Sequence, residues 1–295
     1  MPGGARALRA AQGAVRDNVS FDPRITPARP DLAAEYLRGQ VEAPRFATGE
    51  AREVIDAQAP MRRAPAPDAE QVTEALMGER VTIYEFNDEG WAWGQLDADG
   101  YVGWLPANAL IAPREEPTHV VTALRTFAFP ATSIKLPPVA APPLGSRLAV
   151  LRTERPLSPT SIGYIPARHI ARIGWLESDF VEVAERFVGT PYLWGGKTNY
   201  GIDCSGLVQV ALNACGIACP RDSDMQEAAL GARIENDALR RGDLLFWKGH
   251  VAIARDDATL VHANAHHMAV TIEPTDDVLA RAMENGSEVT SVRRL

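Results

Sequence analysis

The residues best suited to nucleophilic chemistry are one cysteine and two histidines in the C-terminal part of this 295-residue chain. Cys204 lies between a glycine-rich run, TPYLWGG at 190–196, and an apolar segment with helical spacing that stops before Gly216. The sequence therefore predicts Cys204 in the first turn of a helix, where unpaired N–H groups and the positive dipole end favour a thiolate. A small buried cysteine is the alternative, but the glycine-rich loop and the polar neighbours favour a nucleophile.

Two histidines can supply the base. We expect strands at 242–247, 250–254 and 260–263, joined by short turns, so that neighbouring strands are antiparallel. Because side chains alternate along a strand, the spacing can place His250 and His262 on one face of the sheet. A helix-start cysteine, a histidine base and a second, orienting histidine would form a triad. One histidine in a strand is more often structural, but this pair favours catalysis.

Residues 176–295 resemble the NlpC/P60 cysteine peptidases. The resemblance is carried by PYLWGG at 191–196, DCSGL at 203–207, PRDS at 220–223, GDL at 242–244, GHV at 249–251 and His262. It implies a papain-like α+β fold, in which a helix with the cysteine packs against an antiparallel sheet that carries both histidines. It also implies that Cys204 is the nucleophile, His250 the general base and acid, and His262 the orienting residue.

An internal repeat organises the preceding part of the chain. The segment GWLPANAL at 103–110 recurs as GYIPARHI at 163–170, and short β-type runs separated by turn residues precede it. The proline of each copy, Pro106 or Pro166, suits a one-turn helix near the end of a small barrel. Both copies resemble bacterial SH3 modules, and the second carries a proline-rich insertion at 137–143 that favours an extended loop.

The chain as a whole is predicted to be α+β with four parts. These are an irregular N-terminal arm at 1–58, a first SH3-like domain at 59–113, a second at 117–173, and the papain-like peptidase domain at 176–295. In the arm, the segment 31–39 reads as a short capped helix. The length fits two or three domains.

Composition excludes several classes of function. A formal charge of −8 argues against nucleic acid or an anionic membrane as partner. No apolar run reaches the roughly 20 residues of a membrane-spanning helix, and the first ten residues lack the apolar stretch of a secretory signal. Three cysteines, an odd number, fit a reducing compartment, so we expect a cytoplasmic protein in which Cys215 and Cys219 pack rather than bridge.

No cofactor is expected. His262, His266 and His267 lie close together in the sequence, but no cysteine or carboxylate completes a metal site at ligand spacing. The segment PRDSD at 220–224 is either a helix N-cap or part of the rim of a cleft, where Arg221 or Asp222 would meet the substrate.

Two SH3-like modules ahead of the peptidase narrow the resemblance to γ-D-glutamyl-L-diamino acid endopeptidases, which act on murein peptides. It implies cleavage after γ-D-Glu in peptides with a free N-terminal L-Ala, with the first module forming part of the substrate pocket. Residues at matching positions would bind the substrate and its free amine: Tyr101, Asp203 and Ser205, with Glu70 as a looser match and Trp194 lining the cleft. In this scheme Asp203 pairs with the ammonium group, and Trp104 rather than Tyr101 packs in the barrel core.

Other functions stay open at this point. The chain could be a general cell-wall peptide hydrolase or amidase, a non-catalytic peptidoglycan-binding protein, or a transamidase or acyl transferase on the same fold. The intact cysteine and histidines argue against the non-catalytic alternative. The diamino acid remains open between meso-diaminopimelate and lysine.

Overall fold

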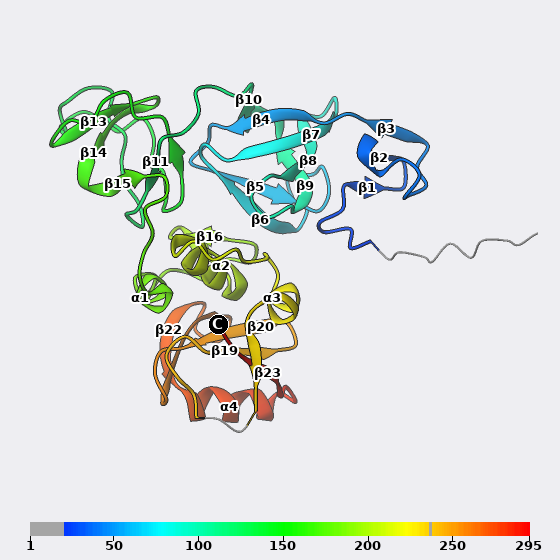
Figure 1. Ribbon diagram of the computed structural model, residues 1–295, viewed down its shortest axis with the longest axis vertical. Coiled ribbons are helices and arrows are strands. Elements are labelled where there is room, and N and C mark those ends of the chain that lie inside the picture. Colours follow the sequence, from blue (N-terminus) through cyan, green and yellow to red (C-terminus); the bar gives the residue numbers. More distant parts are fainter. Residues whose placement is uncertain (1–20, 236–237) are drawn as a thin grey trace, which may run out of the picture.

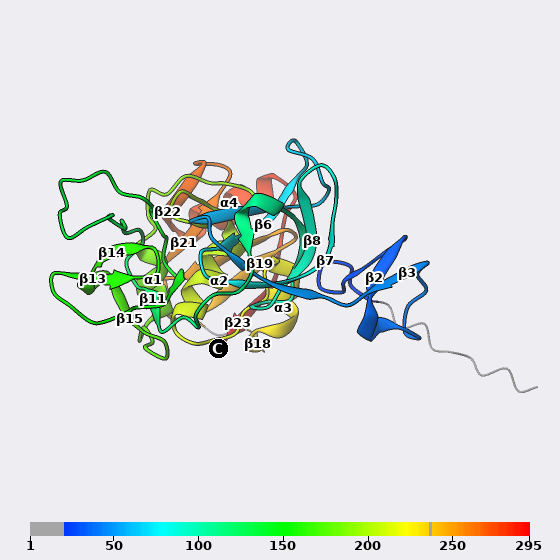
Figure 2. The ribbon, with the colours of Figure 1, turned by 90° about the horizontal axis from the view of Figure 1, so that it is seen from above.

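The computed structural model describes residues 21–235 and 238–295; the first ten residues, in which the sequence predicts no secretory signal, lie outside these ranges. Figure 1 shows two small β domains side by side above a larger C-terminal domain, and an N-terminal arm beyond the first β domain. In the perpendicular view the arm again lies on the side of the first β domain away from the second (Figure 2). No helix in the described part of the chain is long and apolar enough to cross a membrane.

The N-terminal arm is a three-stranded sheet rather than an irregular segment. Its strands are β1 (Ala28–Arg29), β2 (Leu32–Ala34) and β3 (Arg45–Ala47). The capped helix predicted at 31–39 is wrong: β2 is followed by a single 3-10 turn, Glu35–Leu37, without a side-chain cap. The three residues of β2 are all buried, so burial in the folded protein overrides the local helical preference of this segment.

The first β domain is a seven-stranded sheet in the order β10-β4-β7-β8-β9-β5-β6. Its strands are β4 (Glu50–Val54), β5 (Gln58–Arg62), β6 (Gln71–Leu76), β7 (Arg80–Phe86), β8 (Trp91–Leu96), β9 (Val102–Pro106) and β10 (Leu110–Ile111). Strand β4 lies within the range predicted for the arm, so this sheet begins before residue 59. As predicted, a 3-10 turn, Ala107–Ala109, directly follows Pro106.

The second β domain consists of two small sheets, β12-β11-β15 and β13-β14. Its strands are β11 (His119–Val121), β12 (Arg147–Leu148), β13 (Leu157–Thr160), β14 (Gly163–Pro166) and β15 (Ile170–Arg172). Pro166 is followed by the 3-10 turn Ala167–His169, which repeats the arrangement after Pro106. The two domains touch at Gly78, where a Cβ would lie 2.0 Å from the carbonyl oxygen of Arg147.

The C-terminal domain packs helices on both faces of a six-stranded antiparallel sheet with the order β18-β23-β19-β20-β21-β22. Its elements are α1 (Phe180–Glu185), β16 (Lys197–Thr198), β17 (Gly201–Ile202), α2 (Cys204–Ala214), α3 (Ser223–Ala229), β18 (Ala232–Ile234), β19 (Leu244–Trp247), β20 (His250–Ala254), β21 (Thr259–Asn264), β22 (Ala269–Pro274), α4 (Thr275–Glu284) and β23 (Val289–Arg294). Helix α2 lies toward the β domains and α4 at the opposite end (Figure 1).

Two apolar clusters hold this sheet. Residues with odd numbers in β20 and β21, such as Val251 and Val261, pack with α1 and α2. Residues with even numbers, such as Ala252 and Leu260, pack with Val278 of α4. This alternation is the period-2 pattern of a sheet buried on both faces.

Candidate active site

Cys204 is the first residue of α2, as the sequence predicts. Asp203 is the N-cap, and its Oδ1 accepts a hydrogen bond of 2.7 Å from the N–H of Gly206. A Cβ at Gly206 would lie 2.3 Å from the carbonyl oxygen of Gly196, so only glycine allows the helix start to approach the glycine-rich loop this closely. Local sequence therefore fixes the position of the cysteine.

The protonation state of Cys204 differs from the prediction. The thiol is buried, and burial, followed by the charge of Asp203, raises its pKa to about 12. The backbone N–H groups of Val251 and Ser205 lower the pKa but do not outweigh burial. The expected stable thiolate is therefore wrong for the free protein, because desolvation of the charged sulfur exceeds the stabilisation from the helix start.

His250 and His262 lie in contact on neighbouring strands, as their spacing predicts. His250 Nε2 is 3.0 Å from His262 Nδ1, and the rings meet edge to face. The residue after His250, Val251, places its N–H beside the Cys204 sulfur, so the beginning of β20 joins the histidine pair to the cysteine. Burial lowers the pKa of His250 to about 3 and also lowers the pKa of His262, so both rings are neutral near pH 7.

A carboxylate that the sequence analysis did not single out completes this chain of side chains. Glu273 Oε2 lies 2.8 Å from His262 Nε2. Although burial raises the pKa of Glu273, hydrogen bonds from Arg281, His262 and His267 lower it to about 2. The signal was present in the hairpin: His262 pairs with Thr271 across β21 and β22, and Glu273 is two residues further on the same strand.

The Asp203 carboxylate is ion-paired in the structure, whereas the sequence analysis left it free for an ammonium group. Arg221 is 1% exposed and binds both carboxylate oxygens of Asp203, at 2.7 and 3.0 Å. The same guanidinium donates to Ser205 Oγ at 2.8 Å, and Ser205 donates to Asp203. Arg221 therefore neutralises Asp203 under the helix start and does not lie at the rim of the cleft.

The other predicted binding residues do meet in one cavity with the cysteine, of about 250 Å³. Its lining includes Glu70, Tyr101, Trp194, Asp203, Cys204, Ser205 and Asp222. Tyr101 is 3% exposed and belongs to the core of the first β domain, contrary to expectation, but its hydroxyl donates to Asp222 Oδ2 at 2.9 Å. Trp194 is 58% exposed, and its Nε1 donates to Glu70 at 3.2 Å.

The N-terminal arm also reaches this cavity, which no sequence signal indicated. Arg24 of the arm contacts Asp222 at 2.9 Å and Asp224 at 2.8 Å, and Asp22 holds its other side. The carbonyl oxygen of Arg24 accepts a hydrogen bond from Val102 of β9. Asp222 is the N-cap residue of α3, although its side chain makes no capping hydrogen bond. It also lines the cavity, so the segment serves both as a helix start and as part of the cleft rim.

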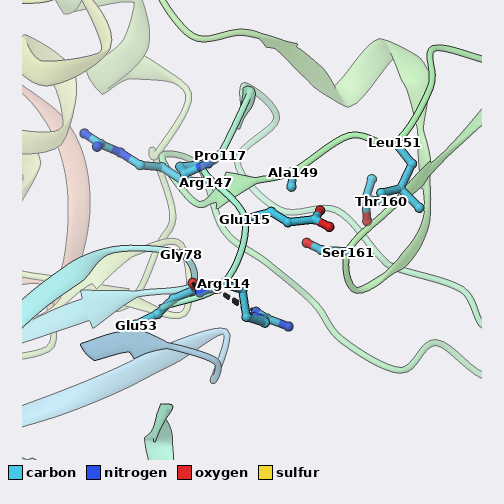
Figure 3. A pocket seen from close by; sticks show the side chains of 10 residues that line it. All are labelled: Glu53, Gly78, Arg114, Glu115, Pro117, Arg147, Ala149, Leu151, Thr160 and Ser161. Carbon is cyan, nitrogen blue, oxygen red and sulfur yellow. Dashed lines mark hydrogen bonds and ion pairs between the residues drawn. The ribbon is translucent and has the colours of Figure 1, made fainter. Parts of the chain in front are cut away.

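Two larger cavities have no cysteine in their lining. One of about 450 Å³ lies between the two β domains (Figure 3). Its Glu53 is paired with Arg80 and Arg114, at 2.7 Å each, and no cysteine or histidine lines it. A second, of about 470 Å³, borders His250 and His262 on the side of α4.

The remaining histidines and cysteines have simpler surroundings. His267 contacts Glu273 at 3.1 Å, and its ring stacks edge to face on His266. Across residues 21–235 and 238–295, no group of three or more histidine, cysteine or acidic side chains is arranged to hold a metal ion. Cys215 and Cys219 are free, as predicted.

Comparison with known families agrees with this geometry. Residues 189–284, which include the cysteine and both histidines, match the model of the NlpC/P60 family. The C-terminal domain belongs to the NlpC/P60 family. Residues 61–110 match the model described as a bacterial dipeptidyl-peptidase SH3 domain, while the SH3-like nature of the second β domain stays a prediction. The NlpC/P60 family is one of peptidases, so the protein is a hydrolase by family.

Individual relatives resemble much of the chain. A γ-D-glutamyl-L-lysine dipeptidyl-peptidase from Bacillus cereus is 26% identical over 68% of this chain and 70% of its own length. Dipeptidyl-peptidase 6 from Lysinibacillus sphaericus is 27% identical over 76% and 91%. The crystal structure of an NlpC/P60 family protein from Bacillus cereus superposes with a TM-score of 0.72 at 21% identity, covering 83% of this chain and 99% of that one. The likeness of that structure extends over the arrangement of the β domains and the NlpC/P60 domain.

Proposed function

We propose that this protein is a cysteine endopeptidase that hydrolyses the bond between γ-D-Glu and the diamino acid in free murein peptides that begin with L-Ala. The observation that carries the proposal is the cavity that Cys204 shares with Tyr101, Glu70 and Asp222. The names of the Bacillus cereus and Lysinibacillus sphaericus relatives point to the same class of reaction. The substrate would be a small peptide released during cell-wall turnover.

Catalysis would start from a neutral thiol and a neutral imidazole. His250 accepts the proton of Cys204 as the sulfur bonds to the γ-carbonyl carbon of D-Glu, and N–H groups at the helix start face the developing oxyanion. The protonated His250 then gives this proton to the leaving amine as the C–N bond breaks. Finally a water molecule, deprotonated by His250, hydrolyses the thioester and restores the thiol.

The free amine of L-Ala would be bound by Asp222 rather than by Asp203. Among the described residues, both hydrogen bonds to the Asp222 carboxylate end on Oδ2, which leaves Oδ1 for a ligand. The Tyr101 hydroxyl donates to Asp222, so its lone pairs can accept from an ammonium group. Asp222 is about one quarter exposed, which makes it accessible from the cavity.

The charge of the cavity favours a cationic group. Asp203 is neutralised by Arg221, so the carboxylates that remain in the lining are Glu70, Asp222 and Asp224, against the guanidinium groups of two arginines. Three negative and two positive charges leave one negative charge for an ammonium to neutralise. An acylated amine is neutral and would leave that negative charge without a cationic partner.

The size of the cavity points the same way. At about 250 Å³ it is slightly smaller than most ligand cavities, whose volumes begin at roughly 300 Å³. The first β domain closes it through Tyr101, and the arm closes it through Arg24. An L-Ala-γ-D-Glu unit is of suitable size, whereas a peptide that still carries muramic acid would collide with these walls.

The deciding experiment is hydrolysis of defined peptides. The protein is incubated with L-Ala-γ-D-Glu-meso-diaminopimelate, with the lysine analogue, and with the N-acetyl form of each, and the products are identified by mass spectrometry. We expect L-Ala-γ-D-Glu and the free diamino acid from the unblocked peptides only, and no turnover by Cys204→Ala. Cleavage of free and acetylated peptides at equal kcat/KM would instead identify a general cell-wall hydrolase.

A further inference from the structure

The side chain behind the histidine pair is a buried carboxylate surrounded by hydrogen-bond donors. Glu273 is 8% exposed, and it receives His262 Nε2 at 2.8 Å, Arg281 at 2.9 and 3.0 Å, and His267 Nε2 at 3.1 Å. Asn264 and Thr271 approach the same carboxylate at 3.4 and 3.3 Å. A carboxylate surrounded by donors is ionised and accepts hydrogen bonds without donating any.

This arrangement determines where the protons of the two imidazoles lie. Because Glu273 only accepts, the proton of neutral His262 must be on Nε2, which leaves Nδ1 of the same ring as an acceptor. His262 Nδ1 lies 3.0 Å from His250 Nε2, so His250 must carry its proton on Nε2. The free lone pair of His250 is then on Nδ1.

We propose that Glu273 is a positioning residue which, through His262, holds His250 in the tautomer whose Nδ1 is free to accept a proton from Cys204. The inference rests on the proposed cysteine peptidase function and adds a fourth residue to it. Glu273 does not touch substrate or the reacting atoms. It acts only through the ring of His262, in the way that a carboxylate orients the base of a serine protease.

The electrostatic influence of Glu273 is separable from that of its partner Arg281. Glu273 favours the protonated forms of His250 and His262, whereas the charge of Arg281 disfavours both. The charged or titratable groups that act on the pair are Glu273 from β22, Arg281 from α4 and, for His262, His267 from the β21–β22 turn. Removing Glu273 and removing Arg281 break the same ion pair but change the histidines in opposite directions.

The test compares three variants of the full-length protein. Glu273→Met removes the acceptor, Glu273→Gln keeps a neutral acceptor oxygen, and Arg281→Gln breaks the ion pair while leaving the carboxylate in place. Steady-state kinetics on the unblocked peptide, thermal unfolding, and long-range ¹H–¹⁵N spectra of the histidine rings are measured for each. The spectra report the tautomers without requiring any substrate, so a failure of the proposed function is distinguishable from a failure of this inference.

We expect His250 and His262 of the unmodified protein to be protonated at Nε2, and His262 to lose this single tautomer in Glu273→Met. We expect kcat to fall on the order of 10²-fold in Glu273→Met and about 10-fold in Glu273→Gln, with KM changed less than about threefold. Arg281→Gln should keep the tautomers and stay within about threefold of the unmodified kcat. Equal losses in Glu273→Gln and Arg281→Gln, or His262 protonated at Nδ1 in the unmodified protein, would overturn the inference.

Discussion

Arg221 and Asp203 form a bidentate ion pair beneath the first turn of α2, with contacts of 2.7 and 3.0 Å. Asp203 also accepts the N–H groups of Gly206 and Gly195, at 2.7 and 2.8 Å, so one carboxylate joins the helix start to the glycine-rich loop. Arg221 further donates to Thr73 of the first β domain. The pair therefore connects the position of the nucleophile with the docking of the neighbouring domain.

This connection predicts a large loss of stability when one partner is removed. Arg221→Met leaves the Asp203 carboxylate buried without its cation, and breaking a buried pair in this way costs about 3–5 kcal/mol. We expect that decrease in the free energy of unfolding, measured by urea denaturation of the full-length protein. A decrease below about 1 kcal/mol would contradict it.

The double variant provides the control. In Arg221→Met combined with Asp203→Asn both charges of the pair are removed, so the stability of the double variant should exceed that expected from adding the two single effects. Additive losses would mean that the two side chains act independently.

The sequence predicted the site well where chemistry depends on neighbours in the chain. The position of Cys204 at a helix start follows from the glycine-rich loop before it and the apolar periodicity after it. The contact of His250 with His262 follows from the alternation of side chains along two antiparallel strands. Both are local patterns, and tertiary packing agrees with them.

Residues whose partners lie far away in the chain could not be placed from the sequence. Arg221 pairs with Asp203, 18 positions away, and Arg24 reaches Asp222 across 198 positions. A charged residue looks the same in a sequence whether it is exposed or satisfied by a distant partner. Arg221 pairs with Asp203, the ammonium ligand that the sequence indicated, and for this reason our proposal assigns the ammonium to Asp222 instead.

The predicted thiolate failed for a related reason. The helix start favours the charged sulfur by an amount that depends on local sequence, whereas burial depends on how β20 covers the thiol. Because Cys204 is buried under this strand, desolvation is the larger effect and raises its pKa to about 12. Similarly, the segment 31–39 became a strand and a 3-10 turn because its apolar residues are buried by tertiary contacts.

The raised pKa of Cys204 predicts slow, strongly pH-dependent alkylation. Only the thiolate reacts, so the rate of iodoacetamide labelling at Cys204 should rise about tenfold per pH unit from 7 to 10. Cys215 is more exposed and should be labelled first at pH 7. Peptide mass spectrometry after timed labelling measures both rates. A Cys204 rate that is already constant below pH 8 would show a preformed ion pair with His250.

The lowered pKa of His250 predicts that activity persists in mild acid. A base with a pKa of about 3 stays unprotonated as the pH falls from 7 to 5, whereas an ordinary imidazole would be mostly protonated below 6.5. We expect kcat/KM on the unblocked peptide to change less than about threefold between pH 7 and 5. A fall of tenfold or more, with the protein still folded, would contradict a desolvated neutral base.

The lowered pKa of His250 also predicts that the protein loses stability as the pH falls, although its activity persists. The unfolded chain binds a proton at His250 below pH 6.5 and the folded protein does not until about pH 3, so folding loses stability as the pH falls through this range. The free energy of unfolding of His250→Gln should therefore decline less steeply between pH 6.5 and 4 than that of the unmodified protein. If the free energy of unfolding changed with pH equally steeply in the two proteins, the lowered pKa of His250 would be contradicted.

The last prediction concerns the choice between free and acylated peptides, and it distinguishes Asp222 from Asp203. If the L-Ala ammonium binds Asp222 and the Tyr101 hydroxyl, then Asp222→Asn removes the net negative charge of the cavity that an acetylated amine cannot neutralise. We expect kcat/KM for L-Ala-γ-D-Glu-diaminopimelate to fall about 10²-fold or more, while kcat/KM for the N-acetyl peptide stays low. The ratio of kcat/KM for the free peptide to that for the acetylated peptide, which can reach roughly 10⁴ in the unmodified protein, should fall accordingly. Tyr101→Phe should narrow it less, since the carboxylate remains. Asp203→Asn is the matched control: it should lower the stability and the kcat for every peptide and leave the ratio between free and acetylated substrates unchanged, because Arg221 already occupies Asp203. Kinetics of the three variants on the free and acetylated peptides measure these ratios. A loss of preference for the free peptide in Asp203→Asn but not in Asp222→Asn would show that Asp203 binds the ammonium group, as the sequence indicated.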